Sequence, residues 1–436
     1  MANNKVLKVL FVPILSGGHV YSSIGVAERL IHSGHEVLFL VNDFWSGKLT
    51  KYGIREVLLA KIDSPFETNG ATDLAKHMIA RGLVGGDSPL QKAQREATFV
   101  ELWTKHMKQF DPQFERLLPT IQPDLIVLDQ FMTWPSLELS AIPCVWLWGN
   151  GPLIMVDDEK APPHESGLSA TGDQRLWQEF RQVVRDATKD MWRAFNDWMV
   201  GRGCEPLPEY AIQNPSHYLN IYGIPHELDY QDIRPLGHNF VRFDNFKRTE
   251  SDLTFAVPPE LAEKPGALVY FSLGSFGAAD VANMRRLLAI LAKSPHRFIV
   301  SMGPLHNEYT LADNMWGEEW VPQIRVLPLV DLVITHAGIN TVCETMFFGR
   351  PMIAMPLFSD QYDNSQQIQD TGFGRRLDAY KCSEEELLAA IETLLNDREM
   401  AERVAKVSRR IQTDNSLAKL PQIIEDFVQN RRKYIE

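Results

Sequence analysis

Residues 333–352, VITHAGINTVCETMFFGRPM, combine a short apolar run, a turn of small residues and an amphipathic segment. The apolar run ends at His336, and Ala337 and Gly338 follow it. Val342 and Met346 are then spaced as on one face of a helix. This succession predicts a buried strand that is followed, after a small-residue turn, by a helix.

The start of the predicted helix is suited to an anion. Its first backbone N–H groups lack partners within the helix and carry a partial positive charge. Ala337 and Gly338 are small enough to let a phosphate approach these groups. Asn340 and Thr341 add side-chain donors. We therefore expect a diphosphate to bind at this end of the helix.

Glu344 has two interpretations at this stage. It lies four residues after Asn340 and therefore on the same helix face. A carboxylate repels phosphate but accepts hydrogen bonds from the diol of a ribose, so Glu344 could bind a sugar beside the diphosphate. Alternatively, the helix is buried and Glu344 pairs with an arginine such as Arg350. The residues alone favour neither interpretation.

The rest of the chain alternates strand and helix patterns, which is typical of parallel α/β sheets. Residues 6–15, 35–41, 123–131 and 142–148 are predicted strands, and Gly34 ends a helix over 22–34. Residues 60–118 and 150–215 have mainly helical patterns. After a charged and Pro-rich segment, strands are predicted at 267–275, 296–303, 324–329, 331–336 and 351–358. We expect two doubly wound domains, 1–242 and 267–414, joined by a linker at 243–266. Residues 415–436 are expected to form a helix that packs back on the first domain.

The composition of the chain argues against several classes of function. The chain has 436 residues, 44% hydrophobic and 23% charged, with a net charge of −12. Such an acidic chain is a poor candidate for nonspecific nucleic-acid binding. Its four cysteines form no CxxC pair, which argues against a zinc site and favours a reducing compartment. No apolar run is long enough for a membrane span, and the apolar N-terminus is interpreted as a strand. We expect a cytoplasmic protein that binds no membrane.

Two polar residues at predicted strand ends are candidate catalysts. His19 follows the first strand after Gly17 and Gly18, which should allow a tight turn and leave space above the sheet. Asp129 ends another strand. Each could instead be a cap or packing residue, but together they could form a base and its orienting carboxylate. The sequence lacks a GxxxxGK[ST] loop, GxGxxG, HExxH and GxSxG, so ATPases and metal-dependent hydrolases lose support.

The segments WVPQ (320–323), THAGINTVCE (335–344) and GRPMIAMPLFSDQYDN (349–364) together resemble the signature of UDP-dependent glycosyltransferases of the GT-B superfamily. SGGH, IVLDQF and FSLGS fit the same family, so the resemblance covers nearly the whole chain. Ala337 and Leu329 depart from the pattern, and the loop before THAG is shorter than in plant members. The chain is most similar to bacterial members that glycosylate macrolides and related natural products. The implied fold is two Rossmann-like domains that face each other across a cleft.

The resemblance assigns roles to matching positions. Trp320 would stack on uracil, with Val321 and Gln323 holding base and ribose, and Glu344 would take the ribose hydroxyls. Five residues would bind the diphosphate, namely Ser275, His336, Gly338, Asn340 and Thr341, and Gly18 borders the donor. Asp360 and Gln361 would bind the donor sugar, and Gln361 is associated with glucose. His19 would be the general base and Asp129 would stabilise its imidazolium.

The function implied is inverting transfer of a sugar, glucose being expected, from a UDP-sugar to a hydroxyl of a small hydrophobic acceptor. Such acceptors include flavonoids, phenols, macrolides and xenobiotics. UDP-sugar is a co-substrate, and neither a cofactor nor a metal is expected. The acceptor should lie near four aromatic residues, Phe131, Trp134, Trp146 and Trp148. Alternatives are a lipid or sterol glycosyltransferase, an epimerase of the same superfamily, and an inactive nucleotide-sugar-binding protein.

Overall fold

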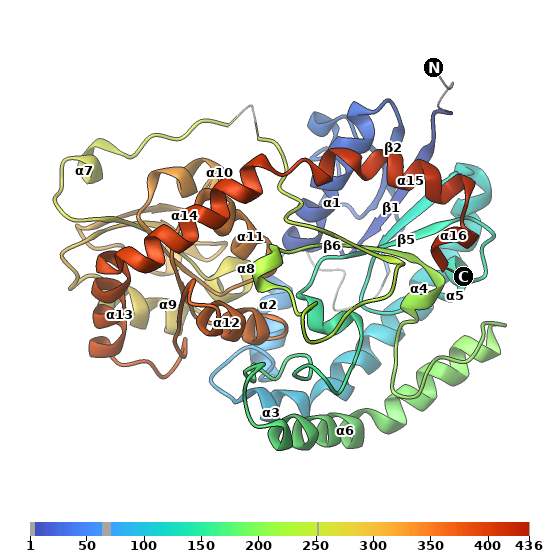
Figure 1. Cartoon of the computed structure of the whole chain (residues 1–436), viewed down its shortest axis with the longest axis horizontal. Helices are drawn as coiled ribbons and strands as arrows, with labels where there is room; N and C mark the ends of the chain where they lie inside the picture. The colour runs from blue at the N-terminus through green and yellow to red at the C-terminus, as the bar shows by residue number, and fades with distance from the viewer. Residues whose placement is uncertain (1–4, 63–70, 251–252, 436) are drawn as a thin grey trace.

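The computed structural model describes residues 5–62, 71–250 and 253–435, in which two parallel β-sheets lie side by side (Figure 1). Parts of the expected segments 60–118, 243–266 and 415–436 fall outside these residues, namely 63–70, 251–252 and 436. The first sheet contains β1 (Lys8–Pro13), β2 (Glu36–Val41), β3 (Arg55–Leu58), β4 (Leu125–Asp129), β5 (Cys144–Trp148), β6 (Leu219–Gly223) and β7 (Phe240–Phe243). The second contains β8 (Leu268–Ser272), β9 (Arg297–Ser301), β10 (Met315–Glu318), β11 (Leu332–Thr335), β12 (Met352–Ala354) and β13 (Gly374–Arg376).

Helices cover both sheets. Those of the first half are α1 (Gly17–His32), α2 (Ala71–Ala80), α3 (Pro89–Ala93), α4 (Glu96–Ile121), α5 (Pro135–Glu138) and α6 (Gln174–Gly201). Those that follow are α7 (Pro259–Ala262), α8 (Gly274–Ala278), α9 (Val281–Leu291), α10 (Gln323–Val326), α11 (Ile339–Phe348), α12 (Gln361–Asp370), α13 (Glu384–Asn396), α14 (Arg398–Thr413), α15 (Leu420–Gln429) and α16 (Arg432–Ile435). Within the described ranges, no helix is long and apolar enough to cross a membrane.

The strand orders are β3-β2-β1-β4-β5-β6-β7 and β10-β9-β8-β11-β12-β13, and every pairing is parallel. Each sheet therefore starts in its interior and is extended first to one edge and then to the other. The predicted doubly wound class is confirmed. In such sheets, ligands bind at the carboxyl ends of the strands where the order reverses. These points are the β1–β4 and β8–β11 junctions, where the candidate residues were expected.

Strand β1 shows why these segments form sheets that are buried on both faces. Leu10 and Val12 contact one hydrophobic cluster, whereas Val9 and Phe11 contact another. Alternate residues of a strand point to opposite faces, so helices must cover both sides of β1. The continuous apolar runs in the sequence have this cause.

Three sequence expectations need correction or extension. Residues 324–329 are not a strand but the helix α10 followed by a 3-10 turn, because Ile324 and Leu327 are both buried at helical spacing. Helix α1 begins at Gly17, so His19 lies in its first turn and not in a loop before it. A Cβ at Gly17 or Gly18 would come no closer than 3.8 Å to another group. These glycines therefore leave open space, but the backbone does not require them.

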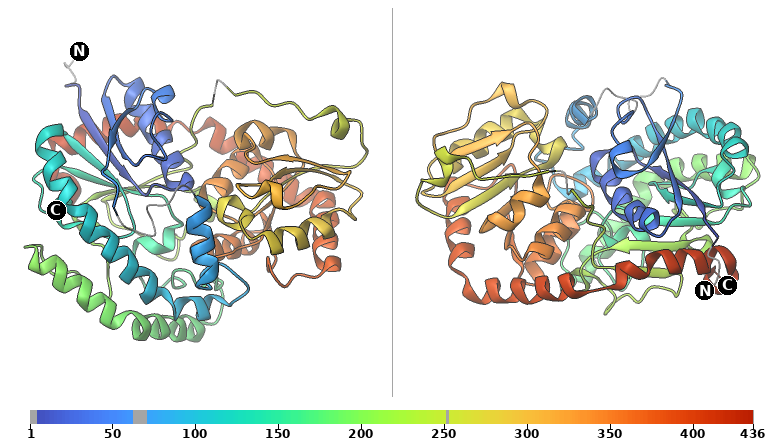
Figure 2. Two further views of the ribbon diagram at one scale, coloured as in Figure 1. Left: turned by 180° about the vertical axis from the view of Figure 1, so that it is seen from behind. Right: turned by 90° about the horizontal axis from the view of Figure 1, so that it is seen from above.

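The chain crosses between the two halves twice. The first crossing follows β7, and the second is made by the C-terminal helices (Figures 1 and 2). Helix α15 packs on α1, and Leu420, Ile424 and Phe427 are buried in the same cluster as Phe11. The side chain of Arg410 on α14 pairs with Glu227 and Asp244. The C-terminal segment thus packs against the first half of the chain and connects the second half to it.

Candidate active site

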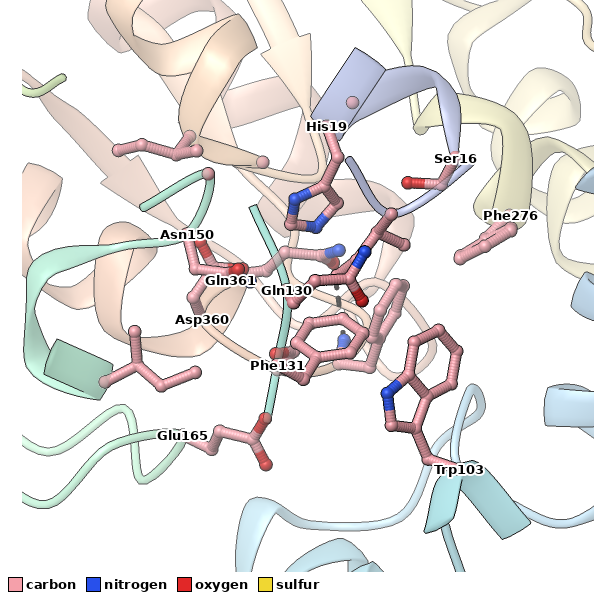
Figure 3. Close-up of a pocket in the computed structure, with 18 of the residues that line it drawn as sticks. Ser16, His19, Trp103, Gln130, Phe131, Asn150, Glu165, Phe276, Asp360 and Gln361 are labelled. Atoms are coloured by element: carbon pink, nitrogen blue, oxygen red, sulfur yellow. Dashed lines mark hydrogen bonds between the residues drawn. The ribbon is translucent and has the colours of Figure 1, made fainter. Parts of the chain in front are cut away.

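A cavity of about 1300 Å³ lies between the carboxyl ends of the two sheets. Figure 3 shows His19 and Phe131 of the first half and Asp360 and Gln361 of the second half around it. Every donor-binding residue expected from the sequence borders this cavity. The cavity is therefore the candidate active site.

His19 and Asp129 form a buried pair. The Nδ1 of His19 is 2.8 Å from Oδ1 of Asp129. This contact directs Nδ1–H to the carboxylate and leaves Nε2 as the nitrogen that can take a proton. Burial lowers the pKa of His19, but the charge and hydrogen bond of Asp129 outweigh it, and the net pKa is raised above 6.5. The ring edge also faces Phe131, with centroids 5.5 Å apart.

Gly149, directly after β5, makes room for this pair. A Cβ at this position would lie 2.6 Å from Nδ1 of His19 and 2.9 Å from Oδ1 of Asp129. Gly149 was not predicted as a site residue. A signal was present, because the predicted strand 142–148 is followed at once by glycine, as the first strand is followed by Ser16-Gly17-Gly18.

The opposite wall is formed by the ends of β8 and β11. The ring of His336 lies between two glycines, because a Cβ at Gly274 or Gly338 would come within 2.8 or 2.6 Å of it. Burial lowers the pKa of His336 to about 4, so the ring is neutral near pH 7. Ser275 is exposed to the cavity, and Thr341 borders it. Neutral donors and the N-terminus of α11 therefore line this wall, which suits a diphosphate.

The two walls touch directly at Asn340. Its Nδ2 donates to the carbonyl oxygen of Gly18 at 2.7 Å, and its Oδ1 accepts from Oγ of Ser22 at 2.8 Å. One amide side chain thus links the first turn of α1 to the first turn of α11. Asn340 and Gly18, both expected at the donor, are brought together by this contact.

The carboxylate of Glu344 is buried and has partners on both oxygens. Nε2 of Gln323 is 2.6 Å from Oε2, and Nη1 of Arg248 is 3.2 Å from Oε1. The alternative that a buried Glu344 pairs with an arginine is therefore correct in kind, but the partner is Arg248, whereas Arg350 donates to the carbonyl of Pro328. Arg248 was not predicted as a site residue, since it lies in a linker without periodicity. Nearby, Trp320 is 46% exposed, which leaves its indole face open to a ring, and Val321 is buried.

Asp360 and Gln361 are at the start of α12. Oδ2 of Asp360 accepts hydrogen bonds from the backbone N–H of Gly151 and from Nδ2 of Asn364. Burial raises the pKa of Asp360 to about 6, so it is ionised at neutral pH. Oε1 of Gln361 accepts from the backbone N–H of Leu357 and of Phe358. That oxygen is therefore engaged by backbone donors, and the amide nitrogen is the group left to bind a ligand.

The expected acceptor residues are divided by the structure. Phe131 and Trp134 line the cavity. The prediction is wrong for Trp146 and Trp148, which are buried in the core away from the cavity and stack on each other at 5.1 Å. Both residues lie on β5, and their side chains point into the core of the first half and not into the cavity. The apolar end of the cavity is formed instead mainly by helices α4 and α6, with Val100, Trp103, Phe110, Phe114, Phe180 and Met191. Amphipathic patterns predicted these helices but not which residues face a ligand.

Other chemistry on the described residues is limited. The four cysteines are free and buried. Among the residues for which coordinates are described, no three His, Cys, Asp or Glu side chains are grouped to hold a metal ion.

The second half of the chain matches a known protein family. Residues 262–424 match the family model of "UDP-glucoronosyl and UDP-glucosyl transferase". Oleandomycin glycosyltransferase of Streptomyces antibioticus is 24% identical over 426 residues, 94% of this chain and 89% of that protein. Human UDP-glucuronosyltransferase 2B28 is 34% identical over 248 residues, 54% of this chain but only 41% of that protein. The match to the human enzyme thus spans less than half of its length.

Solved structures agree on the fold. The calicheamicin glycosyltransferase CalG4 has a TM-score of 0.69 at 19% identity, covering 98% of this chain and 99% of its own. The spinosyn rhamnosyltransferase SpnG has a TM-score of 0.67 at 19% identity, covering 96% and 100%. The second of the two doubly wound domains thus matches the UDP-glucuronosyl and UDP-glucosyl transferase family, and the chain is a glycosyltransferase with the two-domain fold of these solved structures.

Proposed function

We propose that this enzyme transfers glucose from UDP-glucose to a hydroxyl of a small hydrophobic acceptor, with inversion at the anomeric carbon. The observation that carries the proposal is the His19–Asp129 pair at 2.8 Å, in which His19 borders the same cavity as Ser275, His336 and the start of α11. A base on one wall and an anion-binding wall opposite are the two parts that a single displacement needs.

In the proposed reaction, Nε2 of His19 removes the proton of the acceptor hydroxyl as its oxygen attacks the anomeric carbon. The bond between that carbon and the β-phosphate oxygen breaks at the same time, and UDP leaves with the electron pair. Asp129 stabilises the imidazolium that forms. General-base assistance of this kind contributes roughly 10²–10⁴-fold to the rate. Attack opposite to the leaving group inverts the configuration.

The negative charge on UDP would be stabilised by the second half of the chain. The N-terminus of α11 carries partial positive charge, and Ser275, Asn340 and Thr341 border the same cavity as donors. No step in this scheme uses a metal ion. We therefore propose that the reaction is metal-independent, which chelation experiments can test.

The donor sugar would lie near Asp360. Because the pKa of Asp360 is about 6, the carboxylate is ionised at neutral pH and can accept hydrogen bonds from sugar hydroxyls. The same charge would repel the carboxylate of a glucuronic acid donor. Asp360 therefore supports a neutral hexose, and Gln361 supports glucose.

The acceptor would bind at the apolar end of the cavity, between α4 and α6. Trp103 and Phe131 pack edge to face there, with centroids 5.4 Å apart, next to His19. Burial also lowers the pKa of His106 on α4 to about 4, so this ring adds no charge near pH 7. These surroundings favour a hydrophobic aglycone, and the likeness to an oleandomycin glycosyltransferase favours a natural product of that kind.

The decisive experiment compares His19→Ala with His32→Ala, an exposed histidine near the end of the same helix. Product is measured by mass spectrometry with UDP-glucose and a panel of phenolic and macrolide acceptors, and UDP affinity by titration calorimetry. We expect His19→Ala to abolish transfer and keep UDP affinity, while His32→Ala retains both. An active His19→Ala variant would refute the assignment. Wild-type protein that binds UDP without any transfer would instead indicate a binding protein, and transfer only to liposome-bound acceptors would indicate a lipid glycosyltransferase.

A further inference from the structure

The segment after β7 inserts an arginine between the two halves of the chain. The side chain of Arg248 is 6% exposed. Its guanidinium carbon lies 4.0 Å from the ring centroid of Tyr21, on α1 of the first half. Its Nη1 is 3.2 Å from Oε1 of Glu344, on α11 of the second half. Arg248 therefore connects the base-bearing helix with the carboxylate expected at the ribose.

The contacts hold the carboxylate of Glu344 in one orientation. Arg248 binds one of its oxygens, and Nε2 of Gln323 binds the other at 2.6 Å. A carboxylate oxygen has two lone pairs, so each oxygen keeps one acceptor position. Both Glu344 and Arg248 border the cavity, together with Trp320. A diol stacked next to that indole can use the two remaining positions.

The charges around Glu344 make Arg248 necessary for this arrangement. Glu250, also buried, accepts from Nε of Arg248 at 2.6 Å, so two carboxylates share one guanidinium. Burial raises the pKa of Glu344, the charge of Arg248 and the hydrogen bond from Gln323 lower it, Glu250 raises it and Lys247 lowers it, and the net pKa is raised. Without the guanidinium, burial and Glu250 would both favour the protonated acid. The protonated acid has lost one acceptor position to its own hydrogen.

We propose that Arg248 is a positioning residue that orients the Glu344 carboxylate toward the 2′ and 3′ hydroxyls of the nucleotide, so that the enzyme selects ribonucleotide sugars over 2′-deoxyribonucleotide sugars. The inference rests on the proposed UDP-sugar donor. It goes beyond that proposal because it assigns sugar-ring selectivity of the nucleotide to a residue of the interdomain linker.

The test is the ratio of the dissociation constants for 2′-deoxy-UDP-glucose and UDP-glucose, measured by calorimetry. A ratio is insensitive to the fraction of inactive protein. A hydrogen bond to a carboxylate is worth enough to give a wild-type ratio of about tenfold or more. Arg248→Met should reduce the ratio to below about threefold, and Arg248→Lys, which keeps the charge, should stay within about threefold of wild type. The matched control is Arg410→Met, since Arg410 also joins the two halves but does not border the cavity.

The outcomes separate the two proposals. Wild-type protein without measurable UDP-glucose affinity would contradict the proposed function. A wild-type ratio near 1, or an unchanged ratio in Arg248→Met, would overturn the role of Arg248 while leaving the proposed function intact. Equal loss of the ratio in Arg248→Lys and Arg248→Met would contradict the role given to the charge, as would a matching loss in Arg410→Met.

Discussion

Replacing Gly149 by alanine should disable the enzyme through one added methyl group. Gly149 does not have a left-handed backbone conformation, so alanine adds no backbone strain there. Its Cβ would lie 2.6 Å from Nδ1 of His19 and 2.9 and 3.0 Å from the two carboxylate oxygens of Asp129. Both side chains are buried, with 11% and 3% exposed. Because neither side chain can rotate out into solvent, the added methyl group must displace the His19–Asp129 pair within the protein.

The size of the effect follows from these distances. Non-bonded heavy atoms settle at roughly 3.5 Å or more, so the ring of His19 must move by about 1 Å. A misplacement of about 1 Å at a reacting group costs on the order of 10²-fold in rate. The upper limit is the full general-base contribution of roughly 10⁴-fold. We therefore expect kcat to fall between these limits, equivalent to about 2.7–5.4 kcal/mol of transition-state stabilisation.

The assay is steady-state glucoside formation from UDP-glucose, with UDP affinity measured separately by calorimetry. UDP affinity should change by less than about twofold, because Gly149 packs on the base and not on the diphosphate wall. Gly201→Ala is the matched control, since a Cβ there meets nothing within 4 Å and the backbone is not left-handed. A Gly149→Ala enzyme with kcat within about threefold of wild type would show that the observed His19–Asp129 geometry is not the catalytic one.

Three further predictions concern the base, the core and the leaving group. Asp129→Asn removes the charge that raises the pKa of His19 and leaves the burial that lowers it. The acid limb of the pH profile of kcat/KM should therefore move to lower pH, and its plateau should drop at least tenfold. Measurement of kcat/KM from pH 5 to 9 checks both outcomes. Trp148→Phe removes a buried hydrogen bond to Asn220, so the free energy of unfolding should fall by about 1–3 kcal/mol. The KM for the acceptor should stay within about twofold of wild type in this variant, whereas Phe131→Ala should raise it. Excess EDTA should leave the rate unchanged; a loss restored by Mg²⁺ would contradict the metal-independent scheme.

The fold could be predicted because its strands are buried on both faces. Continuous apolar runs such as 9–13 and 125–128 admit few interpretations when helical patterns alternate with them. Residues 324–329 were misjudged for the same reason, since a short apolar run between prolines looks alike in a strand and in a helix. The short strands β3, β6, β7, β10 and β13 were not predicted either. Each is an edge strand or lies beside one, and each is only three to five residues long.

The candidate site was predictable where it depends on strand ends. His19, Asp129 and His336 each lie at or just after the carboxyl end of a strand, and parallel order brings those ends to one edge. Side-chain direction was not predictable. Trp146 and Trp148 are on a strand next to the site, but β5 turns both into the core. Arg248 shows a second limit, since a linker without periodicity gives no indication of what it will contact.

The hydrogen bonds of Asn340 join the two halves of the chain at the cavity. Helices α1 and α11 both begin at the cavity, and Asn340 in the first turn of α11 contacts Gly18 and Ser22 in the first two turns of α1. Each helix start carries about half a positive charge, so two partial charges from different sheets converge on one volume. An anion at this position would be stabilised by both helix starts. We therefore expect both halves to stabilise the leaving group, and the base lies on the helix that supplies one of the two partial charges.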